Sequence, residues 1–231
     1  MPNNLPNSKT RYPFVDYLRG VAIVLMIIFH GAYDLTLFGF LDIDFSEDRL
    51  WYVFPRVIVF LFLFSMGCGL TLAHKDGIKW PPFWKRFRKI ALCAVAITIG
   101  TYFAFPNAWV YFGTLHCIAL TSLMALAFIT RPRLSLIVAV LLITPHLIYG
   151  KSIPWILMSH KSMDYIPPFP WLGVVLLGVF ATHQDWHKLN PKRNFLLNSL
   201  EYLGLKSLLI YMLHQPILYA LSWLLYKFTM L

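Results

Sequence analysis

The sequence predicts an all-α membrane protein, a bundle of about seven transmembrane helices. Hydrophobic residues make up 58% of the 231 residues and charged residues only 13%, whereas a soluble domain is roughly a quarter charged. Mean hydropathy is +0.63. Long stretches without a charged residue recur along the chain, and a helix needs about 20 apolar residues to cross the hydrocarbon. We therefore expect residues 1–231 to form a single transmembrane domain with a short polar tail over residues 1–12.

The first two spans follow directly from the spacing of charges. Between Arg19 and Asp42 the one charged residue is Asp34, which predicts the first helix. Residues 57–74 form an uncharged stretch of 18 residues, which predicts the second.

The other five spans come from four further uncharged stretches. Residues 90–130 are 41 residues long, enough for two helices, and Pro106-Asn107 marks the break between them. The fifth, sixth and seventh helices are expected over residues 134–150, 165–184 and 207–226.

The distribution of positive charge predicts the orientation. The formal net charge is +10, which in a soluble protein would suggest nucleic acid. With the N-terminus in the cytosol, the inner segments hold 15 Lys and Arg residues and the outer segments hold four. We therefore expect a cytosolic N-terminus, an outer C-terminus, the lipid bilayer as a partner, and no nucleic acid.

Ionisable residues inside spans are costly and are therefore functional candidates. Arg19 and His30 are 11 residues apart, which places them within about 20° of one helix face and about 16 Å apart along the axis. Asp34 lies one turn beyond His30, where it can orient the imidazole. Two structural alternatives stay open, a snorkelling Arg19 and a His30 that only bonds within the bundle.

Two further histidines lie near helix ends. His116 follows Gly113, which allows close helix approach. His214 precedes Pro216, which frees backbone carbonyls. For both histidines a catalytic role and a structural hydrogen bond are equally consistent with the sequence.

The predicted cytosolic loop between the second and third helices mixes aromatic and basic residues from Trp80 to Lys89. Such a segment suits an interfacial helix on anionic lipid, and it equally suits a phosphorylated nucleotide. Arg86, Arg88 and Lys89 are the candidates for phosphate binding.

Several segments together resemble the heparan-α-glucosaminide N-acetyltransferase catalytic-domain family. They are Val15–His30, Phe60–Gly67, Tyr111–Leu120, Pro168–Gly173 and Lys206–Pro216. The spacing from Arg19 to His30 is also similar to that of the type 3 membrane acyltransferases.

The resemblance implies a transmembrane acetyltransferase that takes acetyl groups from cytosolic acetyl-CoA, without a metal, and passes them to an acceptor across the membrane. It also suggests a homodimer. In the lysosomal member the acceptor is a terminal glucosamine amine, and the proposed catalytic histidine lies in the first non-cytosolic loop. Residues 31–50 contain no histidine here, so the catalytic role shifts to His30.

The roles implied for this chain are as follows. His30 is the general base or an acetyl carrier, with Asp34 orienting it, and His116 or His214 polarises the thioester carbonyl. Arg19 anchors the coenzyme at the cytosolic mouth. We expect a glucosamine-like amine or a glycan hydroxyl as the acceptor and a bacterial cytoplasmic (inner) membrane as the location. A small membrane transporter, and a b-type cytochrome with His30 and His116 as axial ligands, remain alternatives.

Overall fold

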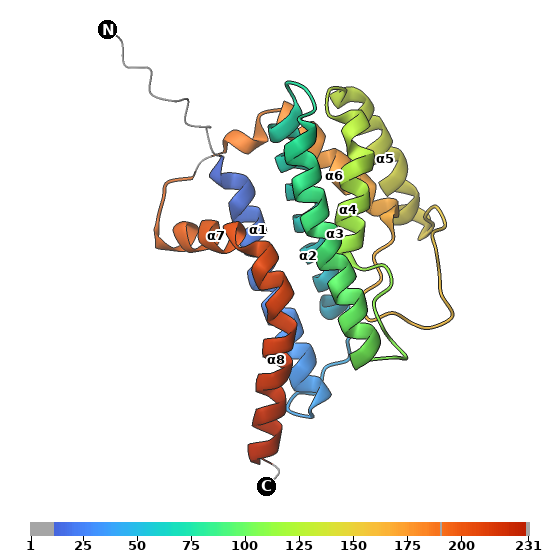
Figure 1. Ribbon diagram of the computed structural model, residues 1–231, viewed down its shortest axis with the longest axis vertical. Coiled ribbons are helices and arrows are strands. Elements are labelled where there is room, and N and C mark those ends of the chain that lie inside the picture. The colour runs from blue at the N-terminus through green and yellow to red at the C-terminus, as the bar shows by residue number, and fades with distance from the viewer. Residues whose placement is uncertain (1–11, 190, 230–231) are drawn as a thin grey trace.

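A computed structural model of the chain is all-helical, which confirms the predicted fold class (Figure 1). It describes residues 12–189 and 191–229, so the predicted polar tail lies outside the described residues except for Tyr12. Within these ranges 75% helix and no strand are found. The α-helices are α1 Pro13–Leu37, α2 Arg49–His74, α3 Trp80–Ala104, α4 Thr114–Ala125, α5 Pro132–Tyr149, α6 Pro168–His183, α7 Phe195–Leu205 and α8 Ser207–Thr229. Two short 3₁₀ segments are η1 Leu126–Phe128 and η2 Trp186–Lys188.

Seven of these helices occupy the places expected for the spans. Helices α1, α2, α3, α5 and α8 are long and apolar enough to cross a membrane, and α4 with η1 and α6 are shorter apolar helices. The predicted break at Pro106-Asn107 is confirmed, because α3 ends at Ala104 and α4 begins at Thr114. From α1 to α6, the connections between successive helices lie at alternate ends of the bundle (Figure 1). Which end faces the cytosol stays a prediction.

Helix α7 was missed by the sequence analysis, which left its residues in a connecting segment. The Asn194 side chain caps its first turn through a 2.8 Å hydrogen bond. With 11 residues it is only about 16 Å long, too short to cross the hydrocarbon. It lies across α1 (Figure 1), where Gly20 and Gly204 each face a backbone carbonyl of the other helix.

The basic aromatic segment is likewise not a separate interfacial helix. It forms the first turns of α3, which begins at Trp80 and continues unbroken into the span. Pro81 and Pro82 occupy the first turn of the helix. Proline has no backbone N–H, but in the first turn that group has no partner within the helix, so nothing is lost. The cations of this segment therefore occupy fixed positions around a helix.

The core is built around α2 and α6, which pack against each other and against α1, α4 and α5. Gly67 and Gly178 allow the close approach, because a side chain on either would meet a carbonyl of the facing helix. The Ser135 hydroxyl of α5 donates to the Leu176 carbonyl of α6 at 2.7 Å. Helices α1 and α8 pack together at the edge of this core.

Candidate functional site

Two polar clusters lie along α1 at different heights. The first surrounds Arg19, and the second contains His30 and Asp34, which lie 11 and 15 residues further along the chain. At about 1.5 Å per residue the clusters are separated by roughly half a bilayer. A single straight helix therefore fixes the distance between them.

His30 and His214 meet where α1 packs against α8. Their ring centroids are 4.8 Å apart with the planes at 67°. The Nδ1 atom of His214 lies 2.7 Å from the backbone carbonyl oxygen of Tyr211. Its Nε2 atom is buried and has no hydrogen-bond partner in the part of the chain that the structure describes. His30 is half-buried, and no hydrogen bond of its side chain is found within the described ranges.

Asp34 lies one turn beyond His30 and is 1% exposed. The amide Nε2 of Gln215 donates to both of its carboxylate oxygens, at 2.9 and 3.2 Å. In the part of the chain that the structure describes, no hydrogen bond joins Asp34 to His30. Asp34 instead holds α8 at the residue next to His214, and Gln215 is a site residue that sequence reasoning missed.

Asp164 is a second missed residue, contributed by the loop before α6. Its carboxylate accepts from the Thr114 backbone nitrogen at 2.8 Å and the Thr114 hydroxyl at 3.3 Å, at the N-terminus of α4. Gly113 leaves room for this carboxylate, which a Cβ would overlap. The Tyr211 hydroxyl lies beside the same carboxylate, and burial raises the pKa of Asp164.

His116 forms hydrogen bonds at the start of its own helix. The Gly113 backbone nitrogen donates to its Nδ1 at 3.2 Å, and its Nε2 lies 3.2 Å from the Thr98 hydroxyl, which donates to the Val110 carbonyl. Both ring nitrogens are therefore engaged at the start of α4. Neither is left for an axial bond to haem, and the contacts do not bring His116 to His30.

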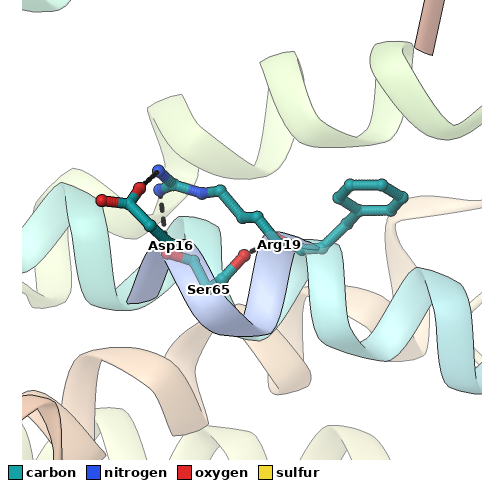
Figure 2. Close-up of polar contacts among 4 residues, drawn as sticks. Asp16, Arg19 and Ser65 are labelled. Atoms are coloured by element: carbon teal, nitrogen blue, oxygen red, sulfur yellow. Dashed lines mark hydrogen bonds and ion pairs between the residues drawn. The ribbon is translucent and has the colours of Figure 1, made fainter. Parts of the chain in front are cut away.

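The Arg19 cluster joins α1 to α2 (Figure 2). Arg19 Nη1 lies 3.4 Å from Asp16 Oδ1, and Arg19 Nη2 donates to the Ser65 backbone carbonyl at 3.3 Å. Asp16 and Ser65 are both buried. These contacts bond the guanidinium to both α1 and α2.

Among the three predicted phosphate ligands of α3, the structure brings Arg86 to Arg19. Arg19 Nη2 and Arg86 Nη1 lie 2.6 and 4.0 Å from the position that a Cβ on Gly69 would take. Arg88 instead donates to the Trp84 carbonyl of its own helix at 3.4 Å. All three of these cationic residues of α3, Lys89 included, are exposed. Two guanidinium groups that converge in this way suit an anion such as a phosphate.

The family model described as "Heparan-alpha-glucosaminide N-acetyltransferase, catalytic" matches residues 11–216. This match covers both polar clusters and every segment that carried the resemblance in the sequence. Comparisons with curated proteins and with solved structures gave no match.

Proposed function

Because the chain belongs to the heparan-α-glucosaminide N-acetyltransferase catalytic family, we propose that it is a membrane acetyltransferase that uses acetyl-CoA. The proposed reaction moves the acetyl group from the coenzyme to a glucosamine-like amine or a glycan hydroxyl. The family match supports the class of reaction, and the two clusters on α1 support its division into a coenzyme end and a transfer end.

The observation that carries the proposal is the convergence of Arg19 and Arg86 half a bilayer away from the histidine pair. Charge-assisted hydrogen bonds from guanidinium groups suit the coenzyme phosphates. With the predicted cytosolic N-terminus, the phosphates enter from the cytosol and the flexible pantetheine arm runs along α1. The thioester then reaches His30.

At the transfer end, neutral imidazole is the natural group for acetyl transfer, because its ordinary pKa lies near neutral pH. His30 takes the role of general base or acetyl carrier, and its position beside His214 supports this role. Asp34 acts by fixing α8 through Gln215 rather than by orienting His30. The acceptor approaches from the outer side, and a bacterial cytoplasmic membrane and a homodimer remain part of the proposal.

The test is acetyl-CoA turnover by purified protein in lipid, with and without glucosamine, for the wild type and His30→Ala. The matched control is His146→Ala, because His146 is exposed and its side chain bonds only to Ser152 within the described ranges. Glucosamine-dependent CoA release that is lost in His30→Ala and kept in His146→Ala is expected. A wild type that neither binds nor turns over acetyl-CoA would refute the proposal and favour the transporter alternative. Binding without turnover would point to a different acceptor.

A further inference from the structure

The two ring nitrogens of His214 are in opposite situations. Nδ1 lies 2.7 Å from the Tyr211 carbonyl oxygen, which can only accept a hydrogen bond, so Nδ1 carries the proton. In a neutral ring the lone pair is then on Nε2. That atom is buried and has no partner among residues 12–189 and 191–229, in a residue that is 9% exposed. A buried acceptor without a donor is rare in native structures and indicates a donor that the protein itself does not supply.

The surroundings of His214 indicate what that donor is. The ring of His30 on α1 lies 4.8 Å from the ring of His214, measured between centroids, and Tyr211 lies one turn away on α8. The carboxylate of Asp34 accepts a hydrogen bond from Gln215. A group bonded to Nε2 of His214 is therefore next to the imidazole at which the acetyl group is proposed to arrive. An amine or hydroxyl of the acceptor has the required N–H or O–H.

We infer that His214, rather than His30, is the general base that takes the acceptor's proton, that His30 contacts the acetyl group beside it, and that Asp164 positions His214 through Tyr211. This inference rests on the proposed acetyl transfer and deepens it by assigning the proton. The acceptor nitrogen or oxygen forms a bond to the acetyl carbon while the carbon–sulfur bond breaks. The acceptor proton moves to Nε2 of His214, and the imidazolium then protonates the thiolate, so that CoA leaves as the thiol and His214 becomes neutral again.

The positioning role follows from the contacts on the other side of Tyr211. Asp164 is anchored to Thr114 at the N-terminus of α4, and the Tyr211 hydroxyl lies beside this carboxylate. The carbonyl of the same tyrosine accepts from His214. Holding the Tyr211 side chain therefore holds the turn of α8 that determines which nitrogen of His214 is protonated.

The first experiment reads the tautomer and needs no activity. In protein with ¹⁵N-labelled histidine in lipid at neutral pH, His214→Gln identifies the signals of His214. A protonated Nδ1 and an unprotonated Nε2 are expected, with a mixture of tautomers in Asp164→Asn and Tyr211→Phe. A proton on Nε2 in the wild type would overturn the assignment of the base, and unchanged tautomers in both variants would overturn the positioning role.

The second experiment measures glucosamine-dependent CoA release. His214→Gln is expected to lower kcat at least about 100-fold, with partial recovery on added imidazole, because general base catalysis contributes about 10²–10⁴-fold. Asp164→Asn and Tyr211→Phe are expected to lower kcat about 10- to 100-fold at unchanged KM for acetyl-CoA. His146→Gln is the control and keeps the wild-type rate. A His214→Gln protein with the wild-type rate would overturn the inference. A wild type that releases no CoA would instead overturn the proposed acetyl transfer, while the NMR result still decides the tautomer.

Discussion

Replacing Arg86 by glutamine is expected to weaken acetyl-CoA binding without destabilising the protein. Arg19 Nη2 and Arg86 Nη1 converge beside Gly69. At a separation of about 7 Å and an effective dielectric constant of about 20, two positive charges repel each other by about 2 kcal/mol. The Asp16 carboxylate beside Arg19 offsets part of this repulsion. Arg86→Gln removes the remainder, so the unliganded variant should unfold at the wild-type temperature or above it.

For coenzyme binding, in contrast to unfolding temperature, Arg86→Gln is expected to be unfavourable. A hydrogen bond to a charged group contributes about 1.5–3 kcal/mol, so losing one to a phosphate should raise the Kd for acetyl-CoA about 10- to 150-fold. Isothermal titration with acetyl-CoA and thermal unfolding in the same lipid mixture measure the two effects. Arg88→Gln is the matched control, because Arg88 donates to its own helix and should change neither quantity. Equal affinity loss in both variants, or none in Arg86→Gln, would refute the reasoning.

Three further predictions concern stability. Gly178→Ala places a Cβ against the Phe64 carbonyl of α2 and should lower the free energy of unfolding by about 1–3 kcal/mol. Gly100→Ala, in open space on α3, should be neutral or stabilising. Equal unfolding temperatures of the two variants would contradict this prediction. Asp34→Ala removes the bond to Gln215 and should cost up to about 1.7 kcal/mol in unfolding assays, a loss that Asp34→Asn should largely avoid. Burial raises the pKa of Asp164 above its ordinary 3.8, so the folded state favours the neutral acid. The contribution of Asp164 to stability is therefore full below the pKa of the unfolded chain and falls as the pH rises through the pKa of the folded protein. Asp164→Asn should flatten that decline in unfolding temperature against pH, and an unchanged slope would count against the buried carboxylate.

The spans could be predicted from the sequence because the hydrocarbon leaves long charge-free stretches in the chain. Helix α7 left no such mark: it contains Glu201, is short, and is held by the close crossing of Gly20 and Gly204. The early start of α3 was missed for a related reason. Its first turns are basic, and a count of charges does not distinguish a loop from a helix that extends beyond the membrane.

The candidate site was only partly predictable. His30 and His214 were each identifiable as polar residues in apolar helices, but their contact joins α1 to α8 across most of the chain and leaves no local pattern. Asp164 lies at the edge of a span, where charges are ordinary. That Arg86 and Arg88 point to different sides could have been predicted from the sequence. At about 100° per residue, residues two positions apart along a helix are about 200° apart around its axis.

The central claim, acetyl transfer at His30, is tested most directly by following the acetyl group itself. Protein reconstituted in lipid receives isotope-labelled acetyl-CoA and glucosamine, and mass spectrometry locates the label. Labelled N-acetylglucosamine is expected from the wild type and from His146→Ala, and none is expected from His30→Ala. Glucosamine that the wild type carries across the membrane unlabelled, or label transfer that His30→Ala retains in full, would contradict the claim.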